Sequence, residues 1–355
     1  MEMQSRNYQN VFKDGICVCV HVGMWDGTLG LNPEDLGLKT ENVVASYELG
    51  KKLLVPKEEI HTFRHLEGQA RNTVDKNSFP FPIGNSKFVT RKNFAKVQAR
   101  LEDLKRQFNT EADQFVADYP AMREAMIPVY KEAAEKAFET LNPVVQEFGA
   151  TDDPEEKRVK REAEKAEFIG KFIDRIVSCY PAVETLRRRF YLTWDVYQTS
   201  APELLLTTAS DVLQTTEAQQ AAAEEAHRQM AATVENFVSS AVSKLRQETS
   251  ALCSKIATAV KSGKVIRSTT IDSLKNHIAW FKDMNFAGDQ TVEAQLDAIQ
   301  KELIDSNTPE QLTTDADLRE EFGRRLDEIA QSAGKVTESD VGSVTGQYRR
   351  VVNWQ

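Results

Sequence analysis

The sequence predicts a mostly α-helical protein of the α+β class, an elongated coiled-coil bundle of long helices with a small antiparallel β region. The main indication is residues 203–262, which contain no Gly or Pro and are rich in good helix formers. Apolar residues recur there at steps of three or four, the period of one helical face. Unbroken, this helix would extend about 90 Å, which indicates a coiled-coil arm or the long member of a bundle. A weak apolar stripe over residues 214–223 leaves open whether the helix bends.

A second long helix begins at Arg91. Its apolar residues fall 3, 4, 3, 4 and 7 positions apart, which is typical of a heptad seam. The seam consists of Phe94, Val97, Leu101, Leu104, Phe108 and Phe115, with Ala112 in the gap. We expect Pro120 to end this helix, because proline lacks a backbone donor and clashes with the preceding turn. A further helical stretch then covers residues 121–148, with a kink or restart at Pro128.

Shorter helices complete the helical part of the prediction. We expect them at about residues 41–50, 57–72, 151–180, 181–189, 268–285, 289–305 and 309–332. Asp289 and Thr308 are the expected N-caps of the last two. Gly263 ends the long helix, since Gly readily adopts the left-handed conformation of a helix C-terminus.

Three segments are typical of β structure. Residues 15–22 are β-branched and apolar, and residues 190–200 alternate apolar with polar side chains. Residues 78–90 indicate a hairpin with a tight turn at Gly84-Asn85, and the prolines in its first arm restrict that arm to a sheet edge. We expect the two strands and the hairpin to form one small sheet.

The order of these elements divides the chain into four consecutive parts. Residues 1–90 form a small β/α region with the hairpin, and residues 91–189 form a helical coiled-coil insertion whose ends meet at the sheet. Residues 190–305 contain a strand, the long helix and a helical bundle, and residues 306–355 form a C-terminal helix and tail.

Composition narrows the classes of function. Of the 355 residues, 41% are hydrophobic and 28% are charged, as in a folded, helix-rich protein. The N-terminus lacks the apolar core of a signal peptide, and no stretch approaches the roughly 18 apolar residues of a membrane span, so we expect a cytoplasmic protein without membrane association. The net charge of −9 disfavours general attraction to phosphate and suits a basic or metal-bearing protein partner. Cysteines at positions 17, 19, 179 and 253 form no CxxC pair, so we expect reduced, mostly buried thiols.

No catalytic, cofactor-binding or metal-ligating set emerges from the motifs. His61 and His65 have the spacing of two zinc ligands on one helix face, but Thr62 stands where the metalloprotease motif has its glutamate. The segment Lys261-Ser262-Gly263-Lys264 matches only the end of a phosphate-binding loop and follows a helix instead of a strand. We therefore expect no cofactor and no enzymatic activity.

Two clusters are candidate partner-binding sites. Arg187, Arg188 and Arg189 precede two aromatic residues, and these arginines either bind phosphate or pair with acidic side chains. The tail carries Tyr348, Arg349, Arg350 and Trp354, residue types that are enriched in binding hot spots. It either docks on a partner or folds back on the chain.

The order of several short signatures resembles a known family. NPEDLGL follows the first strand, then come SFPFPIGNSKFVTRKNFAKVQARLEDLKRQFNTEADQFVADYP and RFYLTWDVYQTSAP, and a long helix follows. This order is similar to an uncharacterised family of bacterial and bacteriophage helical proteins over about residues 15–305. Its members are often encoded beside a MoxR-type AAA+ ATPase and a von Willebrand factor A protein. The resemblance implies a component of such an assembly, in the host cytoplasm if phage-encoded, and supplies no catalytic residues.

Three hypotheses follow. The first is a non-enzymatic helical scaffold or adaptor that binds itself, or a MoxR-type AAA+ ATPase and a von Willebrand A protein, and its oligomeric state stays open. The second is a nucleic-acid-associated phage replication or defence protein that uses the arginine cluster together with Arg91, Lys92, Lys96 and Arg100. A minor third is a membrane-active helical protein, which the lack of a hydrophobic hairpin disfavours.

Overall fold

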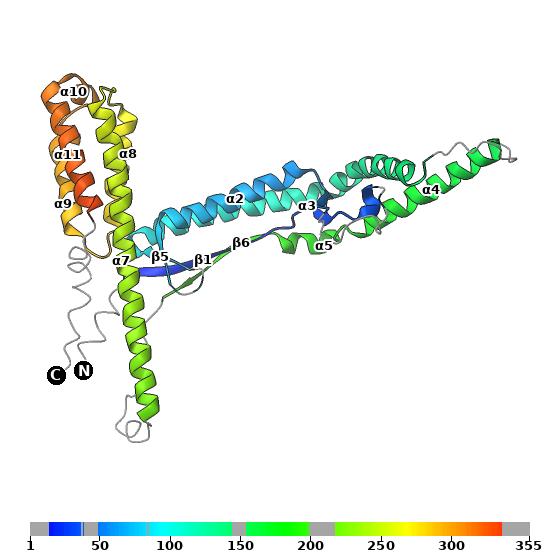
Figure 1. The fold of residues 1–355 in the computed structure, drawn as a ribbon, viewed down its shortest axis with the longest axis horizontal. Coiled ribbons are helices and arrows are strands. Elements are labelled where there is room, and N and C mark those ends of the chain that lie inside the picture. Colours follow the sequence, from blue (N-terminus) through cyan, green and yellow to red (C-terminus); the bar gives the residue numbers. More distant parts are fainter. Residues whose placement is uncertain are drawn as a thin grey trace. The chain divides into compact units, whose positions relative to one another are not determined.

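The computed structural model confirms a mostly helical chain with a small antiparallel sheet (Figure 1). It describes residues 14–36, 38, 49–82, 84, 86–143, 154–198 and 217–335. The strands are β1 (Gly15–Gly23), β2 (Thr28–Gly30), β3 (Lys51–Leu53), β4 (Ser78–Pro80), β5 (Lys87–Thr90) and β6 (Tyr191–Tyr197). The α-helices are α2 (Lys57–Lys76), α3 (Arg91–Leu141), α4 (Pro154–Ser178), α5 (Val183–Leu186), α7 (Glu217–Lys261), α8 (Ser268–Met284), α9 (Gln290–Ile299), α10 (Pro309–Thr314) and α11 (Ala316–Gly334). Shorter turns are η1 (Pro33–Leu36), η3 (Arg187–Arg189) and the π-helical η4 (Gln300–Ile304).

The chain divides into two compact units, and each is assembled from separate segments. The first unit comprises residues 1–19, 72–100 and 194–355, and the second comprises residues 20–71 and 101–193. The four-part division drawn from the sequence stays a prediction.

The expected sheet is present. Its strand order is β4-β5-β1-β6, and the β4–β5 pair is the predicted hairpin, with Phe79 opposite Phe88. β4 lies at an edge, as the prolines of this arm require, and Pro80 is its last residue. A two-stranded sheet of β2 and β3 was not predicted, because three-residue strands carry too short a pattern to recognise.

Gly15 in β1 allows a close approach by an aromatic ring. A Cβ atom at this position would lie 2.2–2.7 Å from atoms of the Phe88 ring, which is closer than atoms can pack. The ring belongs to the neighbouring strand β5, where Phe88 is 1% exposed in the core. The absence of a side chain at Gly15 therefore sets the position of a core phenylalanine.

Replacing Gly15 with alanine is expected to lower the free energy of unfolding by about 1–3 kcal/mol, because the Phe88 ring must leave its place in the core. Urea denaturation monitored by circular dichroism measures the change. Gly170→Ala in helix α4 is the matched control, since nothing lies within 4 Å of a Cβ there. Alanine should stabilise that helix by about 0.5–1 kcal/mol. Equal effects of both substitutions would contradict the prediction.

Two predicted helix boundaries are wrong. Helix α3 continues through Pro120 and Pro128 to Leu141 as one element of 51 residues. Tertiary contacts on either side of the prolines compensate for the lost backbone bonds: Tyr119 is 1% exposed, and its hydroxyl donates to the Pro181 carbonyl at 3.0 Å. The predicted helix 309–332 is instead two helices, α10 and α11, because Asp315 caps the second by accepting from the Asp317 and Leu318 amides.

The other predicted helices agree with the structure where it describes them. Asp289 caps α9, and Thr308 caps α10 in a reciprocal capping box with Gln311. Gly263 follows α7 with φ of +81°, as expected of a helix-ending glycine. The long helix is described from Glu217 onward, while residues 203–216 and the predicted helix 41–50 lie outside the described residues.

The core of the first unit lies between α7, α8, α9 and α11, and the hairpin adds Phe79, Phe81 and Phe88 to it. Helix α11 packs along α7, and Gly323 allows them to approach closely, since a Cβ atom there would lie 3.3 Å from Val260. Ser250 in α7 also donates to the Ala330 carbonyl at 2.8 Å. The apolar face predicted for α7 is therefore the packing face of a bundle.

His277 in α8 makes the stability of this unit sensitive to acid. Its Nε2 atom lies 2.9 Å from Thr249 Oγ1, its ring packs on Trp280, and burial lowers its pKa to about 4. Between pH 6.5 and 4 the unfolded chain therefore binds a proton at this residue that the folded chain does not. This contribution to stability is present above pH 6.5 and is lost as the pH falls toward 4.

The lost contribution is expected to be at most about 3–4 kcal/mol, from the difference between a pKa of 6.5 in the unfolded chain and about 4 in the folded chain. Urea denaturation of the wild type and His277→Gln at several pH values between 7 and 4 measures it. The difference in unfolding free energy between the two proteins should shrink as the pH falls. His61→Gln, at an exposed histidine of α2, is the control. A difference that stays constant with pH would contradict the prediction.

The second unit has an aromatic core. Phe63 packs against Phe108, Phe115 and Phe190 with ring centroids 4.7–5.8 Å apart, and Trp25 packs against Phe115. The predicted seam of α3 lies in these contacts, since Leu101, Leu104, Phe108, Ala112 and Phe115 are all buried. Part of the seam therefore forms an intramolecular core.

Buried polar groups connect α3 and α4 to the segment that contains β3. The hydroxyl of Tyr130 donates to the Leu53 carbonyl, and that of Tyr180 donates to the Leu54 carbonyl at 2.7 Å. Burial raises the pKa of both phenols to about 12, so they remain hydrogen-bond donors at neutral pH. The carboxylate of Asp35 contacts Lys52 and Arg175, at 2.6 and 2.7 Å.

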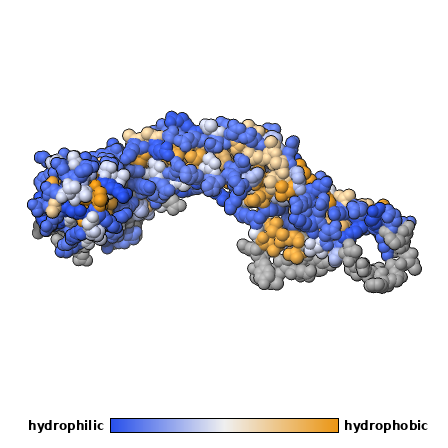
Figure 2. All heavy atoms as spheres, turned by 90° about the horizontal axis from the view of Figure 1, so that it is seen from above, coloured by the Kyte–Doolittle hydropathy of each residue, from blue (hydrophilic) through white to orange (hydrophobic). Residues whose placement is uncertain are grey.

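The surface is mainly hydrophilic on the face that Figure 2 shows, with hydrophobic residues gathered in separate patches. In the described ranges, no helix is long and apolar enough to cross a membrane. Of the four cysteines, Cys17 and Cys253 are buried, Cys19 is half-buried and Cys179 is exposed.

Candidate functional site

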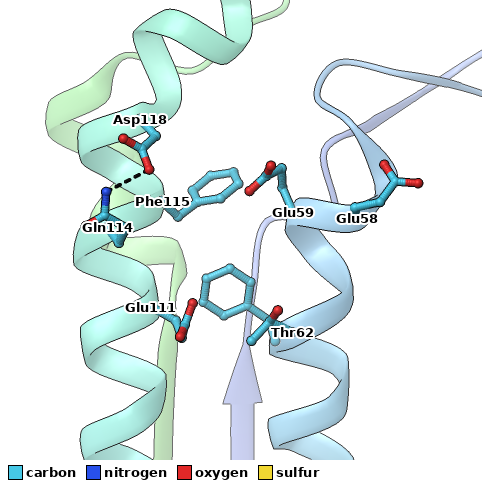
Figure 3. Close-up of a pocket in the computed structure, with 8 residues that line it drawn as sticks. Glu58, Glu59, Thr62, Glu111, Gln114, Phe115 and Asp118 are labelled. Carbon is cyan, nitrogen blue, oxygen red and sulfur yellow. Dashed lines mark hydrogen bonds between the residues drawn. The ribbon is translucent and has the colours of Figure 1, made fainter.

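A polar groove follows the surface between helices α2 and α3 of the second unit. At one end is a pocket of about 130 Å³, which Figure 3 shows. Helix α2 contributes Glu58 and Glu59 from its first turn, and α3 contributes Glu111 and Asp118. In Figure 3 the side chains of Glu59 and Glu111 point into the space between the two helices.

The local sequence explains these positions. Pro56 precedes α2, and carboxylates in the first turn of a helix are favoured by the positive end of its dipole. On α3, Glu111, Gln114 and Asp118 are three and four residues apart and so lie on one face. Beside them Phe115 is 4% exposed in the aromatic core, which fixes this face of α3 relative to α2.

A larger pocket of about 450 Å³ continues the groove along the same two helices. The two pockets share Thr62 and Glu111 as lining residues. The larger pocket is lined by Thr62, His65, Leu66 and Gln69 of α2 and by Asp103, Arg106, Gln107, Thr110 and Glu111 of α3. Together the two linings contain five carboxylates against one guanidinium, so the groove is acidic.

Several side chains of the groove form hydrogen bonds with a residue of the same helix. Gln114 donates to Asp118 at 2.7 Å, and Gln107 donates to Asp103 at 2.9 Å. His65 Nε2 lies 2.7 Å from the Gln69 amide nitrogen. Carboxylates and amide oxygens arranged in this way accept hydrogen bonds from Lys and Arg side chains. The arrangement therefore suits a basic protein surface.

The three arginines of the predicted cluster have different surroundings in the structure. Arg187 is held within the second unit, since its Nε atom pairs with Asp113 at 2.6 Å and its other nitrogens donate to Asn109 and to the Phe190 carbonyl. Arg188 and Arg189 are exposed on η3. Tyr348, Arg349, Arg350 and Trp354 lie outside the described residues.

The remaining candidates lie on helix surfaces. His61 and His65 are both exposed on α2, and among the described residues no group of three His, Cys, Asp or Glu is placed to hold a metal ion. Arg91, Lys92, Lys96 and Arg100 are exposed on the first turns of α3.

The groove between α2 and α3 was not predicted from the sequence. A signal was present on α3, where polar residues recur three or four positions apart from Asp103 to Asp118, beside the apolar seam. Such a stripe is usual on a solvated helix face. Only the pairing of α2 with α3 turns it into one wall of a groove.

The chain matches one protein family, whose function is unknown. No curated protein and no solved structure matches the chain significantly. Residues 13–239 match the family model described as "Protein of unknown function (DUF3150)". This match covers the second unit and ends within α7. Because it includes more than half of the sequence, the chain belongs to this uncharacterised family.

Proposed function

We propose that the protein is a non-enzymatic helical scaffold or adaptor that binds a basic surface of a protein partner in the α2–α3 groove. The observation that carries the proposal is the groove itself, with five carboxylates on two helices that an aromatic core holds together. Acidic side chains on a fixed framework attract a basic partner and orient it at low cost in conformational entropy.

We infer that the partners of the protein are a MoxR-type AAA+ ATPase and a von Willebrand factor A protein, in the cytoplasm of a bacterium or a phage-infected host. This inference is supported by the family resemblance alone, through the genes that often neighbour its members. In such an assembly the protein connects the ATPase with the von Willebrand A protein.

An affinity pull-down of the tagged full-length chain from its native host, with ATP and with ADP, tests the proposal. We expect mass spectrometry to identify an AAA+ ATPase and a von Willebrand A protein, in amounts that change with the nucleotide. The same experiment with Glu59→Lys/Glu111→Lys should lose most of the partner, because opposite charges then face its basic surface.

The matched control is Glu124→Lys/Glu156→Lys. These two glutamates are exposed on α3 and α4, do not line the groove, and change the net charge by the same amount. Equal losses with both double variants would show that net charge, and not the groove, governs binding. Recovery of no partner at all by the wild type would reject the adaptor function.

The nucleic-acid hypothesis has a separate test. Arg188 and Arg189 are exposed, as are Arg91 and Lys92 at the start of α3, and binding through them must weaken steeply with salt. Retention of the wild type on DNA or RNA at low salt, lost on raising the salt, would favour this second function over the first.

A further inference from the structure

Three arginines of the second unit carry positive charge that no carboxylate of the described chain balances. Arg188 and Arg189 are exposed on η3, which directly follows α5, and Arg123 is half-buried on α3. Among the described residues, none of these three guanidinium groups forms a hydrogen bond or an ion pair. Arg187, the neighbouring residue, is paired within the unit and does not share this property.

The segment that carries the exposed arginines is fixed to α3 on both sides of α5. Before α5, the Tyr119 hydroxyl of α3 donates to the Pro181 carbonyl at 3.0 Å. After α5, Arg187 pairs with Asp113 of α3 at 2.6 Å, and Phe190 is buried in the aromatic core. A partner can therefore bind the two exposed arginines without the entropic cost of ordering the backbone that carries them.

Aromatic rings position Arg123 toward the same place. Its guanidinium carbon lies over the Tyr180 ring, 5.5 Å from the ring centre, and the rings of Tyr180 and Tyr119 are 6.2 Å apart. Burial raises the pKa of Tyr119 to about 12, and the positive charges of Arg123 and Arg189 oppose this rise. Both guanidinium groups are therefore close enough to act on one buried hydroxyl group, Arg123 from α3 and Arg189 from η3.

The chemistry of these groups favours an acidic protein segment over a nucleic acid. Guanidinium groups bind carboxylates through paired hydrogen bonds, and arginine is enriched in protein interfaces. Proteins that bind DNA typically neutralise about six to ten phosphates, but only three arginines gather here. Glu184 is exposed on α5 between Arg123's contact at Tyr180 and η3, and its charge would repel a continuous phosphate backbone. Val183 beside it is 39% exposed and offers an apolar contact to a polypeptide.

We propose that Arg123, Arg188 and Arg189 form a docking site for an acidic segment of a protein partner, whose Asp and Glu carboxylates pair with the three guanidinium groups. The biological role of the site rests on the adaptor function proposed above, which it deepens. A protein that connects two others needs two docking sites. The α2–α3 groove suits a basic surface and the arginine site suits an acidic one, so their opposite charges select different partners.

Binding of fluorescein-labelled hexaglutamate to the full-length chain at low salt, measured by fluorescence anisotropy, tests the proposal. We expect the wild type to bind the peptide and Arg123→Gln/Arg189→Gln to bind it about tenfold more weakly, because two charged contacts are lost. Arg64→Gln/Lys160→Gln is the matched control. It changes the net charge equally at two exposed residues on α2 and α4 of the same unit, and should bind as the wild type does.

A wild type that does not bind hexaglutamate overturns the proposal, as do equal losses in the two double variants. Tighter binding of labelled oligothymidylate than of hexaglutamate, lost in Arg123→Gln/Arg189→Gln, would assign the site to nucleic acid instead. Circular dichroism establishes whether this variant folds. If it does not, Arg188→Gln/Arg189→Gln, at two exposed residues, takes its place.

The peptide test is independent of the groove and of the ATPase. Failure to bind hexaglutamate would reject the arginine site and leave the binding of a basic partner in the groove unaffected. A pull-down without partners would reject the adaptor function, whereas the loss of peptide binding in Arg123→Gln/Arg189→Gln would still establish the arginine site.

Discussion

Replacing Asp35 with alanine is expected to lower the free energy of unfolding by about 3–5 kcal/mol, because it leaves a buried ammonium group without its carboxylate. Lys52 Nζ lies 2.6 Å from Asp35 Oδ2, and the two side chains are only 8% and 3% exposed. The same carboxylate accepts from Arg175 at 2.7 Å and from the Asn32 backbone amide at 2.9 Å. Urea denaturation at neutral pH measures the loss.

Lys51, which precedes Lys52 in β3, provides the control for Asp35→Ala. Lys51 pairs with Asp26 at 3.4 Å, but the two side chains are 67% and 46% exposed. Lys51→Ala should therefore cost less than about 1 kcal/mol. Adding Lys52→Met to Asp35→Ala should restore part of the stability, because it removes the buried charge that has lost its partner. If Asp35→Ala costs no more than Lys51→Ala, burial does not strengthen this ion pair.

Features encoded within a few residues could be predicted from the sequence. The β-branched run at residues 15–22 became β1, and the prolines of the hairpin placed its first arm at a sheet edge. Asp289 and Thr308 cap the helices that follow them, because a cap acts on amides only two or three residues away. Periodicity, caps and turn residues are local, so the sequence shows them directly.

Features that depend on distant contacts could not be predicted. Pro120 would end an isolated helix, but the contact of Tyr119 with Pro181, 62 residues away, lies in a core that holds α3 together. Asp35 and Arg175 are 140 residues apart, and nothing near either residue indicates the other. The groove likewise exists only because α2 and α3 pack side by side. Without homologous sequences or a fold, such pairs carry no recognisable pattern.

Neutralising Asp289 is expected to have an effect as large as that of Asp35→Ala, in the other unit. Arg246 Nε lies 2.6 Å from Asp289 Oδ2 and a second guanidinium nitrogen lies 3.2 Å from Oδ1, with side chains that are 4% and 2% exposed. Asp289 also caps α9 by accepting from the Val292 amide. Asp289→Asn keeps an oxygen for the cap but removes the charge, so about 3–5 kcal/mol should be lost in urea denaturation.

A double-mutant cycle separates the ion pair from the packing around it. Arg246→Met alone leaves the Asp289 carboxylate buried without the guanidinium and should also destabilise the protein. The double variant Arg246→Met/Asp289→Asn has neither charge, so it should be more stable than Asp289→Asn alone. Asp305→Asn breaks the exposed pair with Lys275, at 3.0 Å, and should cost less than about 1 kcal/mol. Additive losses in the cycle would mean that the two charges do not depend on each other, and that Asp289 stabilises the unit mainly by capping α9.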